Sequence, residues 1–127
     1  MSYIEVSDIK SNLAKGFALQ DYIIEADGEI NDLAESLGIR DTSEIETNPL
    51  HHKIKRFGVT FIMMRICQDK MGSNDPTIDI MEKYLVQYNL YRKELAALKS
   101  EISAEMFTGL VNEISDRVVF SGYIYRN

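Results

Sequence analysis

The stretch that decides the fold of this 127-residue chain runs from Pro49 to Gly72 and reads PLHHKIKRFGVTFIMMRICQDKMG. Between Phe57 and Cys67 its only clearly polar side chains are those of Thr60 and Arg65. At about 100° per residue, its apolar side chains point in nearly every direction around a helical axis. A helix of this kind is normally buried on more than one side, so we predict that it forms the core of the fold.

The boundaries of this core helix are marked by residues with known positional preferences. Asn48 is the predicted N-cap and Pro49 is the predicted first helical residue. Gly72 is predicted to end the helix in the left-handed (αL) conformation. Gly58, inside the helix, costs about 1 kcal/mol relative to alanine, which predicts that another helix approaches closely there.

The flanking sequence predicts two more long helices and a short one, giving a mainly α fold: a small bundle of three long helices with a short N-terminal helix. The short helix runs from a cap at Ser7 to about Lys15, the second from Leu19 to Leu37, ended by Gly38, and the last from Pro76, capped by Asp75, to about Lys99 or Ser100. Residues 39–48 read as a polar loop, and residues 103–109 as one helical turn ended by glycine. The predicted inward stripes are Ile23, Ala26, Ile30, Leu33 and Leu37 on the second helix, and Ile78, Met81, Leu85, Tyr88 and Leu95, widened by Tyr84 and Tyr91, on the last.

Composition places the chain among ordinary soluble globular proteins, with 45% apolar and 27% charged residues, and its length fits one domain. A single cysteine, Cys67, excludes an internal disulfide bond. No signal-peptide pattern and no apolar run of transmembrane length is evident, so we expect synthesis in the cytoplasm and no membrane partner.

The charge is unevenly distributed along the chain. Residues 1–48 carry 11 acidic and 3 basic residues, whereas residues 49–127 carry 9 acidic and 11 basic ones. A domain that grips nucleic-acid phosphates should show a basic face, so this asymmetry argues against that class. It fits either neutralisation of one half of the chain by the other or assembly with further copies.

An acidic row lies opposite the inward stripe of the second helix and comprises Asp21, Glu25, Glu29 and Asp32. One interpretation is a solvated outer face; the other is a surface that faces something negative without binding it. The basic cluster at residues 53–56 can pair with this helix in the same copy or in a neighbouring one.

The C-terminal residues have the composition of a β-strand, with β-branched and aromatic side chains from Arg117 onward. A terminus this apolar is not expected to be left loose in water. It either folds back as a hairpin or docks on another chain, and we favour docking. We therefore divide the chain into a helical domain, residues 1–102, and an extended or β C-terminal arm, residues 103–127, whose docking residues are Val118, Val119, Phe120, Tyr123, Ile124, Tyr125 and Arg126.

No catalytic signature is evident, so we predict that the chain is not an enzyme and has no cofactor or metal site. It lacks a phosphate-binding glycine loop, an HExxH motif and a CxxC motif. Cys67 is predicted to be a buried, unreactive thiol. His51 and His52 project about 100° apart on a helix and are poorly placed to share a metal ion.

The order of these parts resembles that of the head–tail connector (adaptor, or head-completion) proteins of tailed bacteriophages. The resemblance covers about residues 4–99 and rests on three stretches: Asp21…Ala26-Asp-Gly-Glu29-Ile30…Leu33, then Asn48-Pro49-Leu50, then Ile54-Lys-Arg-Phe57…Phe61…Met64-Arg-Ile-Cys67. The chain departs from the family pattern at Asp32, where a tyrosine is usual, and in a core helix richer in methionine and phenylalanine.

The resemblance implies a structural virion protein at the head–tail junction. Such proteins form rings, commonly dodecameric, that bind the portal protein, carry further neck or tail proteins and extend the channel through which DNA passes without specific binding. It further implies that the C-terminal arm docks on the portal or a neighbouring subunit and that the acidic row faces the channel. The alternative from another class is a small cytosolic helical adaptor or regulator that binds one protein partner through its C-terminal tail.

Overall fold

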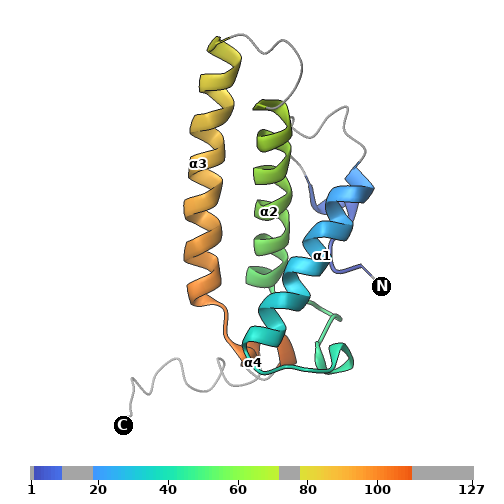
Figure 1. Cartoon of the computed structure of the whole chain (residues 1–127). Coiled ribbons are helices and arrows are strands. Elements are labelled where there is room, and N and C mark those ends of the chain that lie inside the picture. The colour runs from blue at the N-terminus through green and yellow to red at the C-terminus, as the bar shows by residue number, and fades with distance from the viewer. Residues whose placement is uncertain (1, 10–18, 72–77, 110–127) are drawn as a thin grey trace.

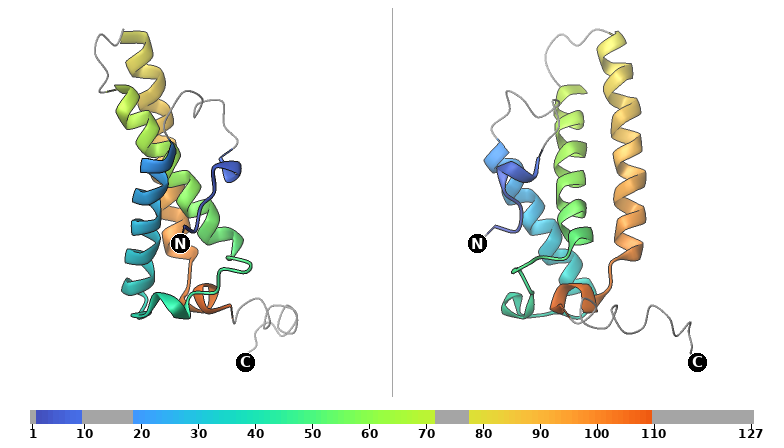
Figure 2. Two further views of the ribbon diagram at one scale, coloured as in Figure 1. Left: turned by 90° about the vertical axis from the view of Figure 1, so that its right-hand side faces the viewer. Right: turned by 180° about the vertical axis from the view of Figure 1, so that it is seen from behind.

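The computed structural model describes residues 2–9, 19–71 and 78–109, and within these ranges the chain is helical and contains no strand. Its elements are η1 (Val6–Asp8), α1 (Leu19–Ser36), η3 (Thr42–Glu44), α2 (His52–Met71), α3 (Ile78–Glu101) and α4 (Ala104–Thr108). Helix α2 lies between α1 and α3, and α4 lies across the foot of the three long helices (Figures 1 and 2). The predicted mainly α fold with three long helices is therefore confirmed.

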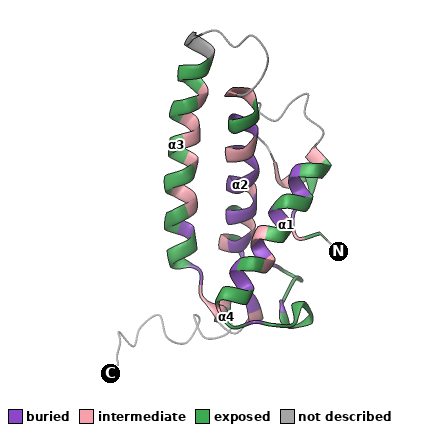
Figure 3. Ribbon diagram, viewed as in Figure 1, coloured by how far each residue is buried: buried purple, intermediate pink, exposed green. Residues whose placement is uncertain are grey.

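Helix α2 is the core helix, as predicted. Its buried residues point in most directions around the axis because α1 and α3 both pack against it (Figure 3). They are Ile54, Phe57, Gly58, Thr60, Phe61, Ile62, Met63, Ile66 and Cys67.

The predicted start of α2 was wrong by three residues. Asn48 and Pro49, joined by a cis peptide bond, precede the helix, and His51 takes the place of the cap. The backbone N–H of Lys53 donates to Nδ1 of His51 at 3.1 Å, and the N–H of Ile54 donates to the His51 carbonyl at 3.0 Å. Leu50 and His51 are buried, so two side chains enter the protein interior just before α2 begins at His52.

Helix α1 follows the prediction closely. Four residues of the predicted stripe are buried and Leu37 is partly buried; Tyr22 and Ala34 are buried as well. Gly38, at φ +94°, ends the helix, where the N–H groups of Gly38 and Ile39 donate to the carbonyls of Glu35 and Ala34 at 3.0 Å each. This pair of bonds is a Schellman motif, which satisfies carbonyls that the end of the helix would otherwise leave unpaired.

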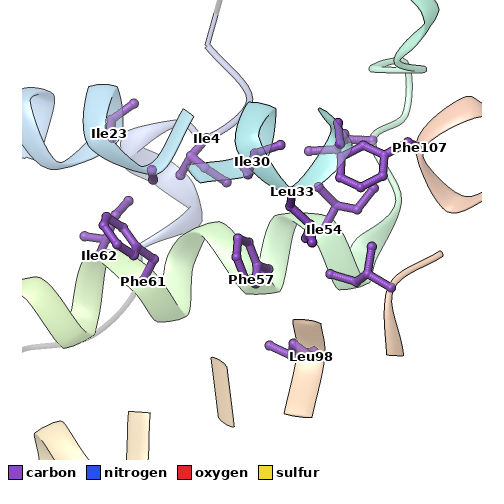
Figure 4. Close-up of a cluster of buried hydrophobic side chains, with 14 of the residues drawn as sticks. Ile4, Ile23, Ile30, Leu33, Ile54, Phe57, Phe61, Ile62, Leu98 and Phe107 are labelled. Carbon is purple, nitrogen blue, oxygen red and sulfur yellow. The ribbon is translucent and has the colours of Figure 1, made fainter. Parts of the chain in front are cut away.

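The N-terminal segment departs from the prediction. Ser7 lies inside η1, and Glu5 forms the cap together with Asp8, whose carboxylate accepts from the Glu5 N–H at 2.8 Å. Ile9 is extended and ends this turn, so the predicted helix is wrong there; residues 10–15 lie outside the described residues. Ile4 is 1% exposed and packs between α1 and α2, where it fills the space above Gly58 (Figure 4). The close approach predicted at Gly58 therefore exists, but its nearest neighbour is this N-terminal side chain, with Ile30 of α1 next.

The predicted inward stripe of α3 was wrong in its upper half. Met81 and Leu85 are exposed, and the side chains that face α2 are Tyr84, Gln87, Tyr88, Tyr91, Glu94, Leu95 and Leu98. Among the described elements, α3 packs mainly against α2. This contact covers one side of the helix and leaves apolar side chains on its other side exposed.

Helix α4 belongs to the helical core, although we had assigned it to the C-terminal arm. It is the single turn predicted from the sequence, and it ends at Gly109 with φ +85°. Phe107 is fully buried beside Leu33 and Ile54, and its carbonyl accepts from the Glu46 N–H at 2.7 Å (Figure 4). The first seven residues of the predicted arm thus pack on the body, and residues 110–127 lie outside the described part.

Candidate interaction surfaces

The acidic row of α1 faces outward, but its members differ in their surroundings. Asp21, Glu25 and Asp32 are exposed and Glu29 is half-buried. Glu25 alone of the four forms an ion pair in the described structure: its Oε1 lies 2.8 Å from Nε of Arg65 on α2. The row is therefore partly neutralised by the neighbouring helix, and the carboxylates of Asp21 and Asp32 are open to solvent.

Arg65 is the centre of a polar cluster that joins α1 to α2 beside the apolar core. Its guanidinium also contacts Gln68, at 2.6 Å, and Asp69, at 3.5 Å, and the hydroxyl of Tyr22 donates to Asp69. The carboxylate of Glu25 raises the pKa of Arg65. Burial, followed by the hydrogen bond to Asp69, raises the pKa of Tyr22 to about 12.

The basic cluster at the start of α2 pairs within the same copy, but with other partners than the acidic helix. Arg56 binds Glu94 of α3 at 2.6 Å, Lys53 binds Glu101 of α3 at 3.0 Å, and Lys55 lies 3.5 Å from Asp8. These pairs clamp α2 to α3 and to the N-terminal segment. They also neutralise the acidic side chains Glu94 and Glu101 of α3, so these two carboxylates do not add negative charge to the outer side of that helix.

The outer side of α3 carries four of the six exposed large apolar side chains among the described residues. Met81, Leu85, Val86 and Leu90 are 42–60% exposed, and the exposed cations Lys83, Arg92 and Lys93 lie among them. We call these seven residues the α3 outer face. Met81 and Leu85 were wrongly predicted to lie in the core. The stripe through Tyr84, Tyr91 and Leu98, at intervals of seven residues, is the sequence signal for the buried side and hence for this exposed face.

Cys67, His51 and His52, which the sequence offers as possible reactive or metal-binding groups, do not form a reactive or metal-binding arrangement in the described structure. Cys67 is fully buried, as predicted, and burial raises the pKa of its thiol. The rings of His51 and His52 are stacked with centroids 4.6 Å apart, and burial lowers the pKa of His51. No group of three or more His, Cys, Asp or Glu side chains within the described ranges is arranged to hold a metal ion.

One polar depression of about 500 Å³ lies between the N-terminal segment, α1 and the loop after it. Its described lining carries hydroxyl and amide groups but no carboxylate, imidazole or thiol, and consists of Tyr3, Asn31, Thr42, Ser43, Ile45 and Thr47. The Tyr3 hydroxyl already donates to Oδ1 of Asn31 at 2.6 Å. The depression therefore presents hydrogen-bonding groups without an acid–base pair.

The predicted docking residues of the arm, Val118–Arg126, lie outside the described residues. The described chain ends at Gly109, at the foot of the bundle beside α4 (Figure 1). Residues 110–127 therefore start from the end of the body at which α1 and α3 both finish.

None of the helices that the structure describes is both long and apolar enough to span a membrane. Comparisons of the chain with protein-family models, with curated proteins and with solved structures found no match.

Proposed function

We propose that this protein is a structural virion protein, a ring-forming head–tail connector that binds the portal of a tailed bacteriophage and extends its DNA channel. The proposal rests on the resemblance over residues 4–99 and on a helical body whose described surface presents interaction faces. Helical connectors need surfaces for neighbouring subunits, for the portal and for later neck proteins, and none of these roles requires a catalytic group.

The observation that carries the proposal is the α3 outer face. Exposed apolar side chains that lie close together on one surface can mark a site of protein–protein contact, because covering them removes apolar surface from water. Here Met81, Leu85, Val86 and Leu90 are left without a partner inside the described subunit. A protein built to assemble explains this arrangement.

The C-terminal arm supplies the second contact in this proposal. Val118, Val119, Phe120, Tyr123, Ile124, Tyr125 and Arg126 dock on the portal or on a neighbouring subunit. The described chain ends at Gly109, beside the foot of the bundle, so the docking residues are connected to that end of the body. The last eighteen residues can span up to about 60 Å when extended.

The acidic row has one of two environments in such a ring. Facing the channel, its carboxylates repel packaged DNA and keep it sliding. Facing a neighbouring subunit, they pair with cations. The two environments differ in whether Asp21 and Asp32 stay solvated after assembly.

Electron microscopy of the protein in its native particle tests the proposal. A ring at the head–tail junction is the expected result, and labelled antibody against the chain identifies its position. A stable complex with one protein partner away from any particle contradicts it and favours the helical adaptor or regulator.

Deletion of residues 118–127 tests the role of the arm. We expect the truncated chain to keep the helical circular dichroism spectrum and the unfolding midpoint of the full chain but to lose assembly on the particle. A truncated chain that unfolds would show that these residues belong to the core. One that still assembles would show that they are not the docking segment.

A further inference from the structure

The α3 outer face is basic on balance among the described residues: its three cations outnumber the exposed acid Glu82, and two further acids of the helix are engaged elsewhere. Glu94 and Glu101 turn toward α2, where they bind Arg56 and Lys53. Within the described residues, Lys83, Arg92 and Lys93 form no ion pair, and Arg92 and Lys83 lie only over neighbouring tyrosine rings at 5.8 Å. Exposed apolar side chains are therefore interspersed with cations that have no acidic partner in the described subunit.

The outer side of α1 has the opposite charge. Residues 19–36 contain six acidic residues and no basic one. Asp21, Asp32 and Glu35 are exposed and form no ion pair in the described structure. The same side carries Ile24, which is 59% exposed, so it offers an apolar contact as well as charge.

Gly28 adds a reason for close approach on this side of α1. It lies in the middle of the helix and is exposed, and a Cβ atom built there meets nothing within 4 Å. Glycine in a helix interior costs about 1 kcal/mol relative to alanine, and no contact inside the described subunit requires it. A bare backbone at this point lets another element lie close to α1.

We propose that the α3 outer face of one subunit binds the outer side of α1, formed by Asp21, Ile24, Gly28, Asp32 and Glu35, on a second copy of this chain. The two faces are complementary in charge, and both contain exposed apolar side chains. A second copy is the occupant that the chain itself supplies, because each copy carries both halves of the contact. For a ring in the phage neck this inference rests on the proposed function; the contact itself can be measured without it.

The position of the two faces determines the type of assembly. They lie on opposite sides of α2, so one contact leaves a free α3 face at one end of the pair and a free α1 face at the other (Figures 1 and 2). Such head-to-tail contacts close into rings or continue as filaments, and do not stop at a symmetric dimer. In this arrangement the acidic side of α1 lies between subunits and not in the channel.

Two half-blocked variants test the inference. Asp32→Lys with Glu35→Lys reverses the α1 side and leaves α3 intact, whereas Arg92→Glu with Lys93→Glu reverses the α3 side and leaves α1 intact. We expect each variant alone to be monomeric by sedimentation velocity at concentrations at which the wild-type chain associates, with at least about a tenfold weaker self-affinity. Mixed together, they should associate again, because the intact α3 face of one variant meets the intact α1 side of the other and the two reversed faces are also opposite in charge.

Matched controls separate the contact from net charge and from misfolding. Glu44→Lys with Glu105→Lys changes the net charge in the same direction and by the same amount as the α1 variant, at exposed sites away from both faces, and should associate as the wild type does. Circular dichroism and urea unfolding establish that every variant is folded. Association of the wild type should weaken as salt increases, because the pairing charges are screened.

Three results would overturn the inference. The first is a variant with a reversed α1 side that still self-associates, since α3 would then pair with itself. The second is a mixture of the two variants that does not associate. The third is a wild-type chain that stays monomeric up to about 1 mM, because the contact would then be weaker than a millimolar Kd.

The outcome is separable from that of the proposed function. If the mixed variants associate but no ring of this protein occurs in phage particles, the neck assignment fails and the contact stands. If particles contain a ring into which either half-blocked variant enters normally, the contact fails and the neck assignment stands.

Discussion

Arg65 of α2 donates a hydrogen bond from Nε to Oε1 of Glu25 on α1 at 2.8 Å, and thereby links the core helix to the acidic helix. One helical turn further along, its Nη1 lies 3.5 Å from Asp69, which also accepts from the hydroxyl of Tyr22. The position of α1 is therefore fixed by a polar cluster as well as by the apolar stripe. In the described structure this is the one ion pair that reaches the acidic row.

Replacing Arg65 should destabilise the fold more than replacing the other arginine that bridges two helices. Arg65→Met removes the polar contacts of a side chain that is 26% exposed. We expect the free energy of unfolding to fall by about 1–2 kcal/mol. Arg56 is 66% exposed, so Arg56→Met should cost less than about 1 kcal/mol. Urea unfolding compares the two; equal losses would show that Arg65 acts as an ordinary surface charge.

The stability of the protein should fall at alkaline pH through Tyr22. Its phenol has a pKa of about 12 in the folded chain against 10.0 for the free group, so the folded state holds a proton that the unfolded state has lost. This contribution is complete below pH 10 and is lost as the pH rises toward 12. Tyr22→Phe should be less stable at pH 8 but should lose less stability between pH 9 and 11. Identical slopes for the two proteins in urea unfolding would contradict the assignment.

Mild acid should destabilise the start of α2 through His51. Its Nδ1 accepts the Lys53 N–H, so the neutral ring is the form that fits, and burial lowers its pKa. Above pH 7 this contribution is complete; it is lost as the pH falls below about 6.5, where the unfolded state takes up a proton first. His51→Asn keeps an acceptor at the cap and should flatten the change between pH 7.5 and 5.5. Urea unfolding at the two pH values measures the change, and an equal loss of stability in the wild type and the variant would contradict this role of His51.

Alanine should have opposite effects at two helical glycines. A Cβ at Gly58 would lie 2.6 Å from Cδ1 and 2.8 Å from Cγ1 of the buried Ile4, so Gly58→Ala should destabilise by about 1 kcal/mol, because overpacking exceeds the gain in helix propensity. Gly28 has open space around it, and Gly28→Ala should stabilise by about 0.5–1 kcal/mol. Thermal unfolding at a fixed low protein concentration measures both. A neutral Gly58→Ala would mean that the N-terminal segment is displaced without cost.

Truncation of Phe107 should show that the chain after α3 is part of the fold. The side chain is fully buried, so Phe107→Ala should cost about 3–5 kcal/mol, a large share of the stability of a small domain. The exposed neighbour Glu105→Ala should change little. Urea unfolding measures both changes. If Phe107→Ala leaves the free energy of unfolding unchanged, the folded body ends near residue 102 instead.

Strong local patterns determined most of the helical elements from sequence. The run from Phe57 to Cys67 is apolar on every side, which is possible only for a buried helix, and the stop at Gly38 follows from its tolerance of positive φ. Ser103 and Gly109 likewise bracket one turn. In each of these cases the information lies within one or two turns of chain.

The tertiary structure alone decided which apolar residues became core and which became surface. Met81 and Leu85 fit an inward stripe as well as Tyr91 and Leu98 do. The second set is inside because α2 covers that side of α3, where Glu94 and Glu101 also meet Arg56 and Lys53. Ile4 and Phe107 enter the core from segments whose local sequence is short and aperiodic, which gives periodicity nothing to detect. The sequence by itself determined where the chain is helical, because that depends on neighbours along the chain. Only packing between distant segments determined the faces that remain exposed, because an apolar side chain is buried only where another element arrives to cover it.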